Sequence, residues 1–162
     1  MAEEEAKKAI KRFDSCVEFI LKAEGGYVND KYDAGGETKY GISKRSYPDV
    51  NIKNLTLDDA KAIYKRDYWD ACGCGDLKEP LDVIVFDTAV NMGVGRAKEF
   101  YQKVQMALYE SESNAVIAYL ELRDKKYNSI VASYPLQKRF LKGWHNRMNH
   151  LREFSGLVEK SY

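Results

Sequence analysis

The chain has 162 residues, of which 44% are hydrophobic and 31% are charged, a composition typical of one compact domain or two tightly joined lobes and not of a disordered chain. Its 26 basic and 25 acidic residues nearly cancel, which argues against a strong attraction to nucleic acid or to an acidic membrane surface. No apolar stretch is long enough to predict a membrane-spanning helix.

The first predicted element is a helix from about Glu5 to Ala23. Its apolar residues recur with helical spacing, and Gly25-Gly26 then ends the pattern. The apolar positions are Ile10, Phe13, Val17, Ile20 and Leu21. Residues 1–13 carry three glutamates and no apolar run, so we expect no secretory signal and synthesis in the cytoplasm.

Residues 27–42 are the only β-prone part of the chain. Short extended pieces alternate there with Asn, Asp and Gly, which predicts a small hairpin or meander. A helix from Thr56 to about Asp70 follows, with Thr56 as its cap and Asp59 in the capping-box position.

The next predicted helix runs from Leu81 to about Met92, with Pro80 as its first residue. It is apolar on several sides and is therefore expected to be the central buried helix. Gly93 and Gly95 interrupt the pattern, and a further helix continues to Leu108.

Two helices complete the prediction. Ser113 or Asn114 caps a helix that runs toward Ser133, and Pro135 separates it from the last one. The apolar residues of the last helix are Phe140, Leu141, Trp144, Met148 and Leu151. We therefore expect a mainly α fold with one small β insertion near residues 27–42.

The cysteines Cys16, Cys72 and Cys74 are an odd number, which argues against a disulfide framework. Cys16 lies beside the first apolar stripe and suits a small buried hydrophobe. Cys72 and Cys74 are expected to be exposed and open to oxidation, and they match no known role. The sequence has no second Cys or His pair that would complete a metal site with Cys72 and Cys74. His145 and His150 are predicted to be surface residues, so we expect no metal and no cofactor.

Glu24 is the most informative residue because it continues the apolar stripe of the first helix. The helix therefore directs a carboxylate toward the interior or toward a cleft, where burial and the negative end of the helix dipole both favour the neutral acid. Cleavage of a glycosidic bond requires such a protonated acid. From periodicity alone, a surface glutamate in a fraying last turn is the more frequent case.

The residues that follow Glu24 strengthen the functional interpretation. Two glycine pairs, at positions 25–26 and 35–36, flank a turn that holds Asp30 and Asp33. Glycine lets the backbone come close to a ligand, and a returning hairpin places Asp33 and Thr38 across from Glu24. For Asp30, ordinary turn capping is the more frequent role.

This stretch closely resembles glycoside hydrolase family 108, a lysozyme-like group of phage endolysins and bacterial homologues. The similarity rests on a Glu-Gly-Gly-Tyr opening at Glu24, followed by an Asp, a Gly-Gly, a Thr and the Gly41-Ile42 pair. A second motif runs from Phe86 to Ala97 and resembles the start of the predicted peptidoglycan-binding region that accompanies the family. The resemblance spans roughly Phe13 to the last helix.

The resemblance implies a lysozyme-like fold and N-acetylmuramidase activity, the hydrolysis of the β-1,4 bond between N-acetylmuramic acid and N-acetylglucosamine. Glu24 matches the catalytic glutamate of the family. Asp33 and Thr38 lie where phage-type lysozymes place residues that handle the attacking water, although the Glu-to-Thr spacing is one residue shorter here. We expect one compact unit over residues 1–162, with a catalytic lobe at 10–78 and a helical lobe at 79–162.

Five further residues are candidates for substrate binding, each with a structural alternative. Tyr27 lines the cleft or packs the hairpin, Trp69 stacks on a sugar or fills the core, and Asn91 donates to a sugar acetamide or caps its helix. Tyr40 and Asp30 complete the set.

Other functions remain open at this point. One is a non-catalytic protein that binds cell wall or assists secretion, and another is a lytic transglycosylase. A nucleic-acid binder is the weakest because the charge is near neutral. The expected partner is the glycan strand of peptidoglycan. We expect the protein to be a monomer and to need a holin or an exporter to leave the cytoplasm.

Overall fold

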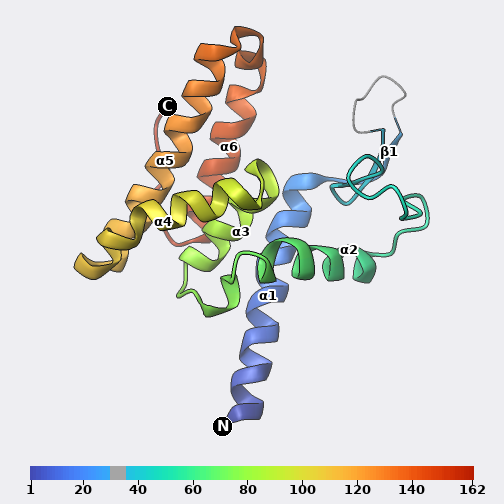
Figure 1. Ribbon diagram of the computed structural model, residues 1–162, viewed down its shortest axis with the longest axis horizontal. Coiled ribbons are helices and arrows are strands. Elements are labelled where there is room, and N and C mark those ends of the chain that lie inside the picture. Colours follow the sequence, from blue (N-terminus) through green and yellow to red (C-terminus); the bar gives the residue numbers. More distant parts are fainter. Residues whose placement is uncertain (30–35) are drawn as a thin grey trace. The chain divides into compact units, whose positions relative to one another are not determined.

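The computed structural model describes residues 1–29 and 36–162 (Figure 1). The mainly α architecture with a small antiparallel sheet, expected from the sequence, is confirmed. The described residues form two compact units, residues 1–70 and 71–162. The functional division at residues 78 and 79 stays a prediction.

The first unit begins with the long helix α1, Ala2–Glu24. Its buried residues, Phe13, Cys16, Val17 and Ile20, recur every three or four positions, as an amphipathic helix requires. Ile10, predicted to belong to this stripe, is 63% exposed. That part of the prediction is wrong, because residues 1–11 are exposed on every side of the helix and have no core to face.

The small sheet contains β1 (Val28–Asn29), β2 (Glu37–Lys39) and β3 (Ile42–Ser43), in that order and antiparallel. Lys39 pairs with Ile42, so Tyr40 and Gly41 form a two-residue turn. Their φ angles of 53° and 78° are those of a type I′ turn, which matches the twist of antiparallel strands. Ile42 is 1% exposed and anchors the sheet.

The helix predicted to follow Thr56 begins as α2, Leu57–Tyr64, and continues as the wider π turn η1, Lys65–Asp70. The predicted capping box is present, with the Asp59 backbone N–H 3.1 Å from Thr56 Oγ1 and the Thr56 N–H 3.2 Å from Asp59 Oδ2. Trp69 lies five residues after Tyr64, a spacing that an ordinary helix would turn away from the core. The wider turn keeps both side chains buried.

The second unit is helical. After the short helix η2 (Cys74–Asp76), α3 (Leu81–Met92) is buried from Leu81 to Ala89, as predicted for the central helix. It is followed by α4 (Val94–Glu110), α5 (Glu112–Ser133), η3 (Pro135–Gln137) and α6 (Lys138–Phe154). Helix α4 packs on α3 and α5, while α5 and α6 run side by side (Figure 1).

Several predicted boundaries in this unit need correction. Pro80 precedes α3 as its cap. Gly93, with φ 95°, ends α3 by itself, so Gly95 lies inside α4 and interrupts nothing. The cap of α5 is Ser111, whose Oγ accepts a hydrogen bond of 3.0 Å from the backbone N–H of Asn114. Capping depends on which residue takes an extended backbone, and several polar residues compete for that role here.

The last helix also carries less apolar burial than predicted. Met148 and Leu151 are fully buried, but Phe140 is 44% exposed. Phe140 lies in the first turn of α6 and contacts Trp144 with a centroid distance of 6.1 Å. Its ring therefore packs along its own helix and stays open to solvent on the other side.

The cysteines are partly as expected. Cys16 is fully buried, in agreement with its prediction. Cys72 is half-buried and Cys74 is fully buried, so the expected exposure of Cys74 is wrong, because η2 places its side chain in the core. Among the described residues, no helix combines the length and apolar character that crossing a membrane requires.

Candidate active site

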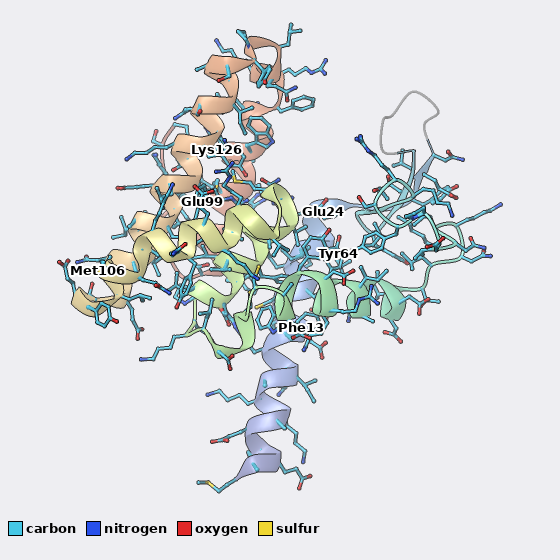
Figure 2. The ribbon with its side chains drawn as sticks, viewed as in Figure 1. Phe13, Glu24, Tyr64, Glu99, Met106 and Lys126 are labelled. Atoms are coloured by element: carbon cyan, nitrogen blue, oxygen red, sulfur yellow. The ribbon has the colours of Figure 1, made fainter. Side chains whose placement is uncertain are left out.

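Glu24 is the last residue of α1 and is half-buried. The backbone N–H of Gly25 still bonds to the Leu21 carbonyl, at 3.2 Å, and Gly25 then leaves the helix with φ 75°. Because this hydrogen bond is helical, the backbone of Glu24 keeps regular helical geometry. The first unit thus places a carboxylate at a helix end, half open to solvent (Figure 2).

The β2–β3 turn lies directly against Glu24. A Cβ atom built on Gly41 would be 2.8 Å from Cβ and 2.9 Å from Cγ of Glu24, and would also overlap the Tyr64 hydroxyl. These separations are far below a normal carbon contact. Only glycine therefore allows the turn to approach the Glu24 side chain this closely, and its positive φ of 78° suits the same residue.

Tyr64, on α2, fixes the position of this turn through a hydrogen bond. Its hydroxyl donates a hydrogen bond of 2.7 Å to the Tyr40 carbonyl, and its side chain is 1% exposed. Tyr40 has a left-handed backbone, with φ 53°, which costs a residue with a side chain about 1–2 kcal/mol. A strained turn fastened by a buried hydrogen bond is a feature of functional sites.

The polar candidates lie just before β1 and on the central strand β2. The Tyr27 hydroxyl donates to Glu37 Oε1 at 2.9 Å, and this bond raises the pKa of Tyr27 above its ordinary value. Tyr27 is 44% exposed. Thr38 occupies the middle of β2, between Val28 and Ser43, and its hydroxyl donates to the Gly36 carbonyl at a long distance of 3.4 Å.

Three further candidate residues are Asp30, Asp33 and Trp69. Asp30 and Asp33 lie outside the described residues. Trp69 is 4% exposed and packs edge-to-face on Phe13, with ring centroids 5.4 Å apart. Its indole fills the core, which was the structural alternative, and offers no ring face for a sugar to stack on.

Asn91 belongs to the second unit, near the end of α3. Its side-chain oxygen accepts a hydrogen bond from the Tyr127 hydroxyl, while Gly93 makes the terminal backbone bond of the helix. Asn91 also lines a shallow cavity of about 190 Å³ together with Arg96 and Trp144. A sugar-binding role for Asn91 stays a prediction.

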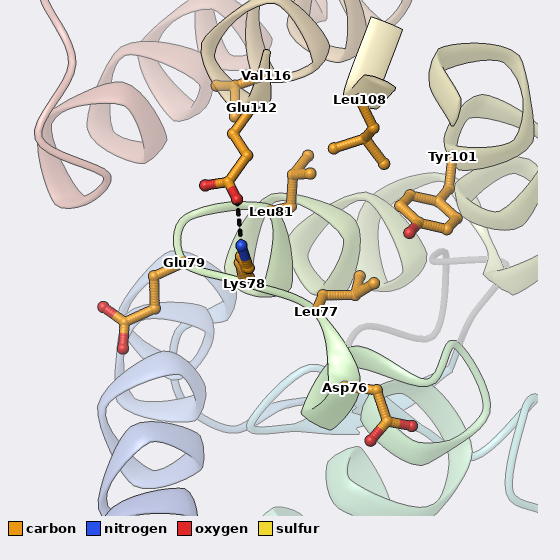
Figure 3. A pocket seen from close by; sticks show the side chains of 9 residues that line it. All are labelled: Asp76, Leu77, Lys78, Glu79, Leu81, Tyr101, Leu108, Glu112 and Val116. Atoms are coloured by element: carbon orange, nitrogen blue, oxygen red, sulfur yellow. Dashed lines mark hydrogen bonds and ion pairs between the residues drawn. The ribbon is translucent and has the colours of Figure 1, made fainter. Parts of the chain in front are cut away.

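A second cavity of this unit, of about 260 Å³, contains none of the predicted site residues (Figure 3). It has an apolar floor that includes Leu77, Leu81 and Leu108, and the Lys78–Glu112 ion pair, at 2.7 Å, closes one side. The lining also includes the carboxylates of Asp76 and Glu79.

Sequence reasoning missed the two residues that position Glu24. The sequence placed Gly41 in a β-prone turn region and in the Gly-Ile pair of the family, and it gave Tyr64 no role in the site. The one available signal was a two-residue turn between short extended segments, which predicts left-handed backbone at Tyr40 and Gly41. Nothing in the sequence indicates that this turn meets the end of α1.

Residues 17–93 match the family profile described as Glycosyl hydrolase 108. This segment of the chain belongs to that family. The matched residues of the glycosyl hydrolase 108 segment include Glu24, the sheet, Tyr64 and helix α3. The match supports glycoside hydrolase activity.

Structural comparison agrees at the level of the fold. The solved structure described as "Structure of Brucella abortus SagA" is similar with a TM-score of 0.74, over 93% of this chain and 97% of that one. The sequences are 22% identical, so the likeness extends to the fold alone. Among curated proteins, none matches the chain.

Proposed function

We propose that this glycosyl hydrolase 108 protein is a peptidoglycan hydrolase that cleaves the β-1,4 bond between N-acetylmuramic acid and N-acetylglucosamine. The observation that carries the proposal is the environment of Glu24. The residue that matches the family's catalytic glutamate stands half-buried at a helix end, against a turn that tolerates only glycine at position 41. A purely surface glutamate has no need of such a fitted backbone.

Glu24 acts as the general acid. It donates its proton to the glycosidic oxygen as the bond breaks, which is how glycosidases make the leaving sugar a neutral alcohol. The Gly41 backbone lies close to the Cβ and Cγ atoms of Glu24, which restricts the conformations in which the carboxyl group meets the substrate. Such restriction lowers the entropy lost on reaching the transition state.

Asp33 is the proposed partner of Glu24, with Asp30 as the less favoured choice. It orients the attacking water or stabilises the positive charge that develops on the sugar, and Thr38 assists with the water. Carboxyl groups about 6.5–9.5 Å apart invert the anomeric carbon, and groups about 5–5.5 Å apart retain its configuration. Tyr27, directly before β1, and Tyr40, in the turn between β2 and β3, line the sugar-binding surface.

The enzyme meets its substrate, the glycan strand, on the outer side of the cytoplasmic membrane. We propose release through a pore such as a phage holin or through a dedicated exporter. No cofactor enters this mechanism, because a carboxylic acid and water suffice for glycoside hydrolysis.

The test is digestion of purified peptidoglycan by the wild type and by Glu24→Gln. Products are reduced with borohydride and their masses are read. The expected result is new reduced muramic acid ends that disappear in Glu24→Gln. Glu18→Gln is the matched control, because Glu18 lies on the same helix but is exposed, and it should digest like the wild type.

Three other outcomes would redirect the assignment. Reduced glucosamine ends would make the protein a glucosaminidase. Anhydro ends would make it a lytic transglycosylase and remove the water-handling role of Asp33. Pelleting with peptidoglycan without any fragments would replace the enzyme by a non-catalytic wall-binding protein.

A further inference from the structure

Cys72 and Cys74 flank a sharp turn at the start of the second unit. Gly73, between them, has a left-handed backbone with φ 64° and ψ 28° and caps η2. The turn is closed by backbone hydrogen bonds of 3.1 Å from Asp76 N–H to the Gly73 carbonyl and from Leu77 N–H to the Cys74 carbonyl. Across this turn the side chains of Cys72 and Cys74 interact through a hydrogen bond.

The two thiols differ in their access to solvent. Cys74 is fully buried and Cys72 is half-buried, so a reagent in solution reaches Cys72 first. The hydrogen bond from Cys74 lowers the pKa of the Cys72 thiol; partial burial opposes this, and the ammonium group of Lys98 adds to the lowering. An accessible thiol with a stabilised thiolate is the kind of cysteine that reacts with a reagent in solution.

We propose that Cys72 and Cys74 form a reversible intramolecular disulfide, with Cys72 as the attacking thiol and Cys74 as the resolving one. The oxidant is a small-molecule disulfide of the glutathione type. Because the pair lies in the first residues of the second unit, the bond restrains the backbone that leads into α3. This chemistry is separate from the proposed hydrolysis of peptidoglycan.

The exchange proceeds in two balanced steps. The Cys72 thiolate attacks one sulfur of oxidised glutathione, which forms a mixed disulfide and expels one glutathione thiolate. The Cys74 thiol then loses its proton and attacks the Cys72 sulfur, which forms the Cys72–Cys74 bond and expels the second glutathione. Two protein thiols are oxidised, and one glutathione disulfide is reduced to two thiols.

The short separation of the pair decides what kind of disulfide it forms. A disulfide stabilises a fold mainly by closing a long loop in the unfolded chain, and only Gly73 lies inside this one. Tight and accessible disulfides are reduced easily and act as labile, regulatory bonds. We therefore expect the pair to follow the redox poise of its surroundings, reduced during synthesis and oxidised in an oxidising compartment.

The experiment equilibrates the folded full chain in buffers of increasing oxidised-to-reduced glutathione ratio, quenches with acid, alkylates free thiols and digests with trypsin. Cleavage after Arg66 and Lys78 yields one peptide, residues 67–78, that contains both cysteines, whereas Cys16 falls in residues 13–22. The expected result is a 67–78 peptide that loses both alkyl groups and the mass of two hydrogen atoms. Cys16, buried in α1, stays thiol and shows that the chain remained folded.

Single variants separate the two roles. Cys74→Ser should lose the internal disulfide and accumulate glutathione on position 72. Cys72→Ser should lose both products, because Cys74 is buried. Cys16→Ser is the matched control and should titrate like the wild type.

Two results would overturn the proposal. One is a wild-type 67–78 peptide that remains fully alkylated in excess oxidised glutathione. The other is a stable glutathione adduct on Cys72 in the wild type, which would mean that Cys74 does not resolve it.

Discussion

The two units of the molecule treat a carboxylate in opposite ways. In the second unit, Asp87 is fully buried and held by two guanidinium groups, with Arg123 Nη1 at 2.6 Å and Arg147 Nη2 at 2.9 Å. Burial alone would raise the pKa of Asp87, but the two arginines outweigh it and keep the pKa below its usual range. In the first unit, Glu24 is half open to solvent and lies against a backbone turn.

The difference separates a structural carboxylate from a chemical one. The ion pair between Asp87 and Arg123 connects α3 with α5 inside the core, and Arg123 also donates to the Tyr127 hydroxyl of its own helix at 3.1 Å. Such a buried charge must stay ionised and paired. Glu24 is half open to solvent, as the proposed general acid must be to reach a substrate.

The largest expected contrast comes from replacing each carboxylate by its amide. Glu24→Gln should lower hydrolysis by about 10²–10⁴-fold, the usual contribution of a general acid, with unchanged stability. Asp87→Asn should lower the free energy of unfolding by about 3–5 kcal/mol, because Arg123 and Arg147 then face a neutral group. Urea unfolding measures the stability of both variants and peptidoglycan digestion measures their activity, so each variant is tested for both effects. Equal effects on stability would remove the distinction between the two regions.

Gly41→Ala tests the close approach of the turn to Glu24. The new methyl group overlaps Glu24 and Tyr64, and we expect a loss of about 1–3 kcal/mol from overpacking in addition to left-handed strain, with reduced hydrolysis. Gly36→Ala is the matched control, because its φ of 68° gives similar strain but its Cβ meets nothing within 4 Å in the described structure. Equal melting temperatures for the two variants would contradict the fitted site.

Acid should weaken the second unit through Asp87. Its pKa is lowered on folding, so its contribution is complete above the unfolded value of about 4 and is lost as the pH falls through the folded value. Thermal unfolding of the wild type between pH 6 and pH 2.5, set beside the same series for Asp87→Asn, measures this term. The variant should lose less stability toward acid, and parallel curves would assign the effect to other groups.

The smallest effect is expected at the hydrogen bond that fastens the turn. Tyr64→Phe keeps the ring but removes the donor to the Tyr40 carbonyl, which should cost about 0.5–1.5 kcal/mol and lower hydrolysis moderately. Tyr109→Phe is the control, since Tyr109 is 87% exposed. If Tyr64→Phe left both stability and hydrolysis unchanged, Tyr64 would be only a packing residue.

Local patterns in the sequence were enough to predict the helices and the small sheet, and they singled out Glu24 as the candidate acid. The central helix was predicted with its observed bounds apart from Pro80, and the capping box at Thr56 is present, because both depend on residues close together in the chain. The Glu-Gly-Gly-Tyr motif at Glu24 indicated the family for the same reason.

Only the tertiary structure decided which residues accompany Glu24 and which charges are buried. Tyr64 reaches Tyr40 across 24 positions, and Arg147 reaches Asp87 across 60. Trp69 fills the core because a wider helical turn follows Tyr64. Contacts between residues far apart in sequence depend on how elements pack, and hydrophobic periodicity states which face of a helix is buried but not what it meets.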